Sequence, residues 1–199
     1  MALTEDEVRA VGALVGRCMT WEREYWGQAM QYARLFTPGT VVRGLYPQLA
    51  YSRRNAYEHS TTSGLLYAEG VAFHRFPHER MGWCVDADSG VVEPNFTEPG
   101  TAYFGVVLRP DYMRLAFEAC RDDDGEDGFF GVYGGGRCCP LPDPAVDMVH
   151  DLGRDIPASI RDWVLTADVH PGGPQEPPAW VLDELRRWDG GDGGDCIGS

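Results

Sequence analysis

The stretch from Leu65 to Phe96, LLYAEGVAFHRFPHERMGWCVDADSGVVEPNF, holds most of the side chains able to do chemistry. It carries imidazoles, a thiol and carboxylates, which acyl-transfer enzymes use as base, nucleophile and orienting acid. His74 and His78, with Glu79, would also suit a metal ion. Pro77 between them breaks the helix that an H-x₃-H pair usually needs, so we expect no metal site and no cofactor.

Cys84 is the one thiol in this stretch, within MGWCVD. Strand alternation would put residues 81, 83 and 85 on one face and residues 82, 84 and 86 on the other. A lone cysteine in an apolar strand is more often a small core residue than a nucleophile. We therefore expect Cys84 to be buried, on the face of the strand that is turned away from the expected site at Met81 and the helix that begins at Ser52, and the six cysteines to be free thiols.

Composition excludes several function classes. All 17 basic residues are arginine, so lysine Schiff bases, P-loops and kinase lysines are excluded. The net charge of −14 disfavours direct nucleic-acid and membrane binding, because phosphate contacts need basic side chains. No apolar run is long enough to span a membrane and the N-terminus is acidic, which predicts a cytoplasmic protein. The lack of lysine, with 25 Gly and 14 Pro, is typical of a GC-rich bacterium or its phages.

The elements that must position these groups follow from periodicity and breakers. Thr4 and the acids after it predict a helix start. Residues 4–36 are expected to form one long helix, or two joined near Gly16 or Gly27, followed by a loop over 37–50. Further helices are expected over 52–61, 110–121, 144–152, 157–166 and 179–188, and strands over 65–73, 81–86, 91–93, 103–108 and 129–133. This order predicts an α+β fold with an antiparallel sheet of four or five strands between N-terminal and C-terminal helices. We expect one domain over 1–166, then a Pro/Gly linker, a terminal helix and an acidic tail over 167–199.

Four motifs in this order resemble the transglutaminase-like members of the papain-like cysteine hydrolases. SRRNA at 52–56 resembles the start of the nucleophile helix, and YAEGVA at 67–72 a strand of the sheet. MGWCVD at 81–86 resembles the strand that begins with the base, and VVEPNF at 91–96 the strand that carries the orienting acid. The resemblance covers about residues 48–108 and implies a papain-like core.

The chain departs from that family at the positions that do the chemistry. The resemblance puts Ser52 at the cysteine position, Met81 at the histidine position and Glu93 at the aspartate position. A serine hydroxyl needs an adjacent base and methionine cannot accept its proton. Losing a general base alone costs about 10²–10⁴ in rate. His78, expected in a loop three residues before Met81, is the candidate replacement base.

Three further residues are candidates for binding. Asn55 would hydrogen-bond either a cleft wall or a loop backbone. Glu69, in an otherwise apolar strand, must pair, with Arg53 or Arg54, or face solvent. Trp83 is expected in the core with its N–H group partnered.

The sequence therefore leaves three functions open. The leading hypothesis is a catalytically degenerate domain of bacterial or phage origin that binds a peptide or protein partner. The first alternative is an active peptide or amide hydrolase that uses Ser52, His78 and Glu93. The second is an acidic inhibitor that mimics nucleic acid, which the net charge of −14 permits.

Overall fold

The computed structural model describes residues 2–20, 27, 30–42, 52–74, 76–96, 98–120, 142–168 and 176–189, without the side chains of 76–80 and 120. Six strands form one mixed sheet: β1 (Arg34–Val41), β2 (Leu66–His74), β3 (Phe76–Val85), β4 (Gly90–Glu93), β5 (Ala102–Leu108) and β6 (Met148–Val149). The helices are α1 (Glu5–Cys18), α3 (Ser52–Ser63), α4 (Pro110–Cys120), α5 (Pro144–Asp147), α6 (Ala158–Thr166) and α7 (Ala179–Arg187). The fold is α+β, as predicted.

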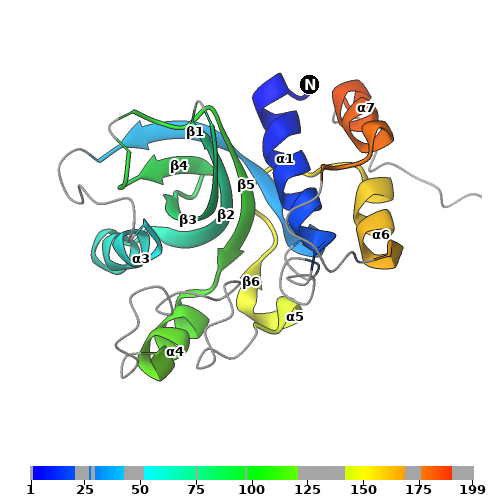
Figure 1. The fold of residues 1–199 in the computed structure, drawn as a ribbon. Helices are drawn as coiled ribbons and strands as arrows, with labels where there is room; N and C mark the ends of the chain where they lie inside the picture. Colours follow the sequence, from blue (N-terminus) through cyan, green and yellow to red (C-terminus); the bar gives the residue numbers. More distant parts are fainter. Residues whose placement is uncertain are drawn as a thin grey trace, which may run out of the picture.

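The sheet closes into a barrel (Figure 1). Its order is β1-β4-β3-β2-β5, and β1 pairs with β5 as well as with β4, while β6 adds to β5. The four predicted strands that begin at 65, 81, 91 and 103 all lie in this sheet, with antiparallel pairing from β4 through β3 and β2 to β5. The expected wholly antiparallel sheet is wrong in one pair, since β1 runs parallel to β4.

Two further expectations about strands need correction. Residues 34–41 form β1 rather than the end of a helix and a loop, although Pro38 and Gly39 lie within it. β3 begins at Phe76, so His78 lies in a strand, opposite Ala72, and not in a loop. The 144–152 segment is a one-turn helix followed by β6. The strand expected over 129–133 and the acidic tail from 190 lie outside the described residues.

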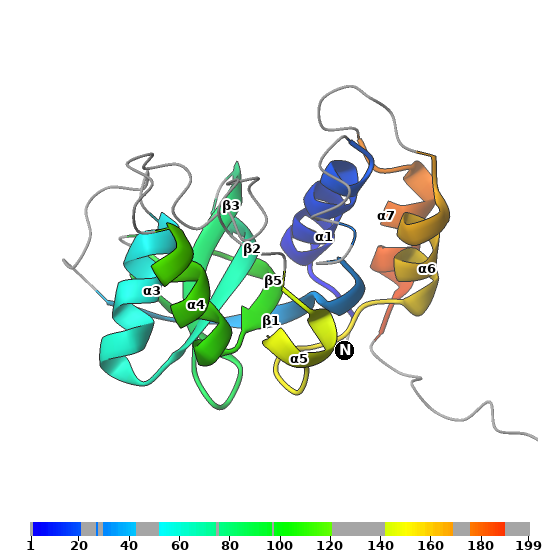
Figure 2. The ribbon, with the colours of Figure 1, turned by 90° about the horizontal axis from the view of Figure 1, so that it is seen from below.

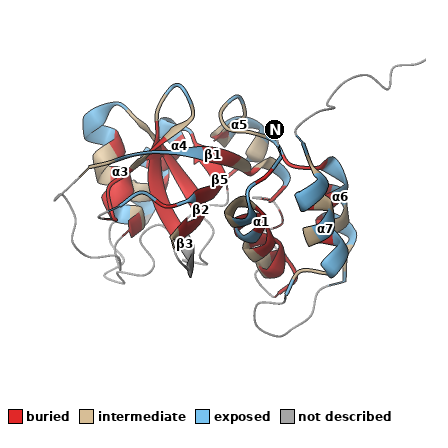
Figure 3. Ribbon diagram, turned by 90° about the horizontal axis from the view of Figure 1, so that it is seen from above, coloured by how far each residue is buried: buried red, intermediate tan, exposed pale blue. Residues whose placement is uncertain are grey.

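The barrel has an inner and an outer set of side chains. The inner cluster contains the aromatic residues Trp83, Tyr103, Phe36 and Phe96 together with Met81 and smaller residues. The outer faces of the strands pack against α1 and α3 and share a second cluster with α6 and α7 (Figure 3). α1 begins as predicted: the Thr4 hydroxyl accepts from the Glu7 N–H and the Glu7 carboxylate accepts from the Thr4 N–H.

Trp83 sets the width of the barrel interior. Its ring lies 5.4 Å from the Tyr103 ring and 6.3 Å from the Phe36 ring, centroid to centroid. It lies over Gly105, where an added Cβ would be 2.8 Å from the indole and 2.2 Å from the Glu69 carbonyl oxygen. Gly105 is paired with Gly70 of β2, so two glycines face each other where the indole needs room.

Replacing Gly105 tests this packing. We expect Gly105→Ala to lower the free energy of unfolding by about 3 kcal/mol, because neither the indole nor the β2 backbone has room to retreat. Urea denaturation measures the change. The control is Gly64→Ala, at φ +73° with nothing within 4 Å of the added carbon, which should cost only about 1 kcal/mol of backbone strain. Equal costs at the two sites would show that the interior is not tightly packed around Trp83.

Candidate functional site

α3 lies on the outer face of β3, and Gly82 allows the close approach. A Cβ at Gly82 would lie 2.7 Å from the Cα atom of Arg53. One turn further on, the Cys84 thiol is 3.2 Å from the Ala56 carbonyl oxygen, which accepts its hydrogen bond. Ser52, Asn55 and Ala56 on this face of the helix are all buried. The resemblance places the nucleophile at the beginning of this helix.

Asn95 joins the helix to two strands. Its side-chain amide donates to the Gly82 carbonyl oxygen at 2.9 Å, and its side-chain oxygen accepts from the Asn55 amide at 3.1 Å. Its backbone N–H donates to Glu93 Oε1 at 2.7 Å. The Asn95 carboxamide therefore contacts both β3 and α3. Asn55 was expected to hydrogen-bond either a cleft wall or a loop backbone, and the structure shows that it hydrogen-bonds the Asn95 side chain. Each of these groups would be costly to bury without its partner.

Glu93 points into the barrel and is fully buried. Oε1 is held by Asn95, and Oε2 accepts from the Tyr103 hydroxyl at 3.2 Å. That hydroxyl in turn accepts from the Gly100 N–H at 2.7 Å. Burial raises the pKa of Glu93 to about 7, although the hydrogen bonds from Asn95 and Tyr103 act to lower it. Burial, and then the nearby Glu93, raise the pKa of the Tyr103 hydroxyl.

The remaining positions of the expected triad lie on different sides of β3. Met81 belongs to the inner cluster and is 4% exposed, whereas the helix that begins at Ser52 covers the outer face. The alternation that was expected between Met81 and Cys84 is present, and Cys84 is the one that faces α3. Burial, with Glu93 as a second cause, raises the pKa of the Cys84 thiol to about 12, so it stays protonated and a poor nucleophile at neutral pH.

No base for Ser52 or Cys84 is visible in the described part of the chain, where no histidine hydrogen-bonds either side chain. The His78 backbone lies on β3, but its side chain is outside the described residues. Among the residues described, no three His, Cys, Asp or Glu side chains are grouped to hold a metal ion. In the described helices, none is long and apolar enough to cross a bilayer.

A second buried carboxylate, Glu69, lies between β2 and α3. It pairs with Arg53 at 3.4 Å and accepts from the Tyr67 hydroxyl at 3.1 Å. Arg53 was one of two predicted partners; the other, Arg54, pairs with Glu58 instead. Burial raises the pKa of Glu69 to about 7, and Arg53 partly offsets this. The carboxylate therefore helps fix α3 on the sheet.

Two residues of the network were missed by the sequence reasoning, and one expected contact is absent. Asn95 lies within the quoted VVEPNF motif, so its position two residues after Glu93 was a usable signal. Tyr103 is an ordinary strand aromatic, and nothing local marks it as a partner of Glu93. The Trp83 indole N–H, expected to have a partner, has none among the described residues, although the ring is fully buried as predicted.

The Asn55–Asn95 pair can be tested with a double-mutant cycle. We expect Asn95→Ala to cost about 2–3 kcal/mol of unfolding free energy, because it leaves buried polar groups on α3 and β3 unpaired. Asn55→Ala should cost less. Together they should show a coupling energy of about 1 kcal/mol. Urea denaturation of the four proteins gives the cycle, and strictly additive effects would contradict the contact.

The burial of Glu93 predicts a pH dependence. Because its pKa is raised from 4.5 to about 7 on folding, its contribution to stability is complete below pH 4.5 and is lost as pH rises through 7. The neutral variant Glu93→Gln avoids that loss. Its unfolding free energy relative to the wild type should rise by on the order of 3 kcal/mol between pH 4 and pH 8.

Urea denaturation across this pH range measures the difference. The control for removing one negative charge is Glu98→Gln, at an exposed position. A difference between Glu93→Gln and wild type that does not change with pH would mean that Glu93 titrates alike in the folded and unfolded chains.

No protein-family model, curated protein or solved structure matches this chain. The resemblance to transglutaminase-like domains therefore rests on the four short motifs, and the function must be argued from the residues of the site.

Proposed function

We propose that this chain is a catalytically inactive domain of the transglutaminase-like type, which binds a peptide or protein partner without cleaving it. The observation that carries the proposal is the state of Glu93. A carboxylate that orients a catalytic histidine must offer that ring an oxygen. Glu93 is fully buried, and its two oxygens accept from the Asn95 N–H and the Tyr103 hydroxyl, so its carboxylate does not open onto a space that a histidine ring and a substrate could share.

The other two positions support the same conclusion. Met81 offers a thioether, which does not take up a proton at neutral pH, and it packs within the barrel. Ser52 is 5% exposed at the beginning of α3. A helix N-terminus stabilises an anion, but that is not enough to ionise an alcohol without a base beside it.

A partner role follows from what the chain retains. α3 contacts β3 at Gly82, and Asn95, just after β4, hydrogen-bonds both of these elements, which supports the proposal that the chain keeps the elements implied by the resemblance. A domain that keeps these elements but lacks a catalytic nucleophile and base is suited to binding a peptide or protein without cleaving it. The net charge of −14 favours a basic partner, because long-range attraction speeds the encounter of opposite charges.

The absence of catalysis can be tested by labelling. We expect no fluorophosphonate adduct at Ser52 in the wild-type chain, measured by peptide mass spectrometry, because no histidine hydrogen-bonds its hydroxyl in the described part of the chain. Stoichiometric labelling of Ser52 would contradict the proposal and favour an active hydrolase with His78 as its base.

The proposed relation to the transglutaminase-like family can be tested by introducing that family's cysteine and histidine at positions 52 and 81. In Ser52→Cys, Met81→His, a shared site requires the new imidazole to turn out of the barrel interior toward the beginning of α3, where it would lower the pKa of the new thiol. We expect iodoacetamide labelling of that cysteine to have a midpoint at least one pH unit below that of Ser52→Cys alone. Equal midpoints near 8.5, the value of an ordinary thiol, would show that the two positions do not share a site.

The partner role needs a binding measurement. A displayed library of random peptides, selected against the folded chain, should yield basic sequences that bind saturably and are recovered intact. Cleaved peptides, or no enrichment over the unfolded chain, would contradict the proposal.

A further inference from the structure

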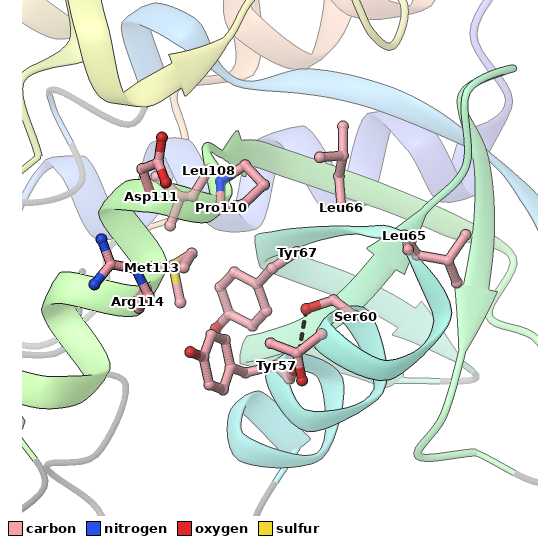
Figure 4. A pocket seen from close by; sticks show the side chains of 12 residues that line it. Tyr57, Ser60, Leu65, Leu66, Tyr67, Leu108, Pro110, Asp111, Met113 and Arg114 are labelled. Carbon is pink, nitrogen blue, oxygen red and sulfur yellow. Dashed lines mark hydrogen bonds between the residues drawn. The ribbon is translucent and has the colours of Figure 1, made fainter.

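The cavity between α3 and α4, of about 380 Å³, has a base formed by core side chains (Figure 4). Tyr57, Tyr67 and Met113, which line it, are 8%, 2% and 1% exposed and belong to one core cluster. A ligand would therefore reach only the rim of this cavity. A second cavity lies beside α6 and α7, which are on the far side of α1 from α3 and α4 (Figures 1 and 2).

This second cavity has a volume of about 460 Å³, which is within the range of ligand-binding sites. It lies where α1 and α6 end and α7 begins, and its apolar lining includes Met19, Trp163 and Pro178. Asp168 and Glu176 contribute two carboxylates to the same lining. Both of these acidic residues are exposed and Trp163 is partly exposed, so the cavity walls are accessible from solvent.

The negative charge of this cavity is not balanced within the described part of the chain. Asp168 and Glu176 form no ion pair with any residue that the structure describes. By contrast, Asp183 of α7 pairs with Arg186 at 3.5 Å. Two unpaired carboxylates that line one cavity, on a chain with a net charge of −14, attract a cation.

Trp163 gives the cavity an aromatic wall that is held in place by a second indole. The Trp163 and Trp180 rings meet edge to face, with centroids 5.2 Å apart and planes at 88°, and Trp180 is 40% exposed. A tryptophan ring attracts a cation more strongly than other aromatic side chains do. An arginine side chain fits both features, because its apolar stem packs on an indole while its planar guanidinium donates to carboxylates.

We propose that this cavity binds an arginine side chain of a peptide or protein partner, with the stem against Trp163 and the guanidinium at the carboxylates of Asp168 and Glu176. The inference rests on the proposed function, because it names the surface with which the chain recognises a basic partner. That surface is separate from α3, the helix that begins at Ser52 (Figure 2). Binding here therefore uses none of the residues expected to form a triad.

The charge preference is tested with blocked tripeptides in an NMR titration of the full chain. The N-acetyl amide of Gly-Arg-Gly should bind saturably, and about tenfold more tightly than the same peptide with citrulline, the uncharged isostere of arginine. This ratio is equivalent to about 1.4 kcal/mol. The lysine form should bind more weakly than the arginine form, because an ammonium lacks the planar face. No saturable binding, or an arginine peptide that binds no better than either analogue, would overturn the proposal.

The two carboxylates are tested with neutral variants of equal shape. In Asp168→Asn, Glu176→Gln, binding of the arginine peptide should weaken about tenfold, and binding of the citrulline peptide should not change. The control, Asp151→Asn, Asp162→Asn, removes two charges from exposed positions that do not line the cavity, and should weaken binding less than about twofold. Thermal unfolding checks that both variants are folded. Equal losses in the two variants would mean that only net charge is sensed, which contradicts a site at this cavity.

The NMR signals of the indole N–H groups locate the bound peptide. Those of Trp163 and Trp180, assigned with Trp163→Phe and Trp180→Phe, should shift saturably as the arginine peptide is added. The signal of Trp83, which lies inside the barrel, should not shift. Binding of the arginine peptide without a response from Trp163 and Trp180 would place it elsewhere and overturn the proposal.

Peptides from the random-library selection separate a failure of this inference from a failure of the proposed function. Selected basic peptides that bind Asp168→Asn, Glu176→Gln as tightly as the wild type would contradict the site and leave the partner role standing. A selection that enriches no peptide, together with a Trp163 signal that responds to the arginine peptide, would contradict the partner role and support the cavity as an arginine site.

Discussion

The buried hydrogen-bond network centred on Asn95 joins α3, β3 and β4, the elements on which the proposed function is based. One carboxamide joins α3 to β3, and the backbone N–H of the same residue binds the carboxylate at the end of β4. From there the network continues through Tyr103 to Gly100. In a water-poor environment each unpaired member would cost more than its bond contributes, so the groups stabilise the fold as a set.

The hydrogen bonds of Glu93 explain why a fold with these elements would not catalyse acyl transfer. In an enzyme of this type, the acid, the base and the nucleophile must face a shared space that substrate can reach. Here Glu93 is buried and hydrogen-bonded by Tyr103 and Asn95, and Met81 packs in the inner cluster that contains Tyr103. Glu93 and Met81 are thus part of the core, which is the arrangement that the proposed inactive binding role requires.

Much of the fold was predictable from local patterns, and the failures have physical causes. Alternating apolar residues and the turn after Asp86 located β3, β4 and β5, and the capping box located α1. β1 was missed because Pro38-Gly39 normally ends an element. Its parallel pairing with β4 and the closure onto β5 join segments far apart in the chain, and no local pattern encodes such contacts.

The candidate site also has features that were predictable from the sequence and features that were not. The pairing of Glu69 with Arg53 followed from the cost of burying a charge, and the burial of Trp83 followed from its place in an apolar strand. The side of β3 that each residue occupies could not be read from the sequence, because alternation separates two faces without saying which one a helix covers. Tyr103 and Asn95 hydrogen-bond Glu93 only once the barrel has closed, so their part in the site could not be predicted from local sequence.

The most direct test of this account is the titration of Glu93 itself, followed through its side-chain carboxyl carbon by NMR and assigned with Glu93→Gln. A carboxylate held inside the barrel should show a midpoint near 7, and its titration should move the Asn95 amide proton in step. A midpoint near the ordinary 4.5, with an Asn95 amide that does not respond, would mean that Glu93 faces water in an open cleft. The proposal that Glu93 is a structural rather than a catalytic carboxylate would then be wrong.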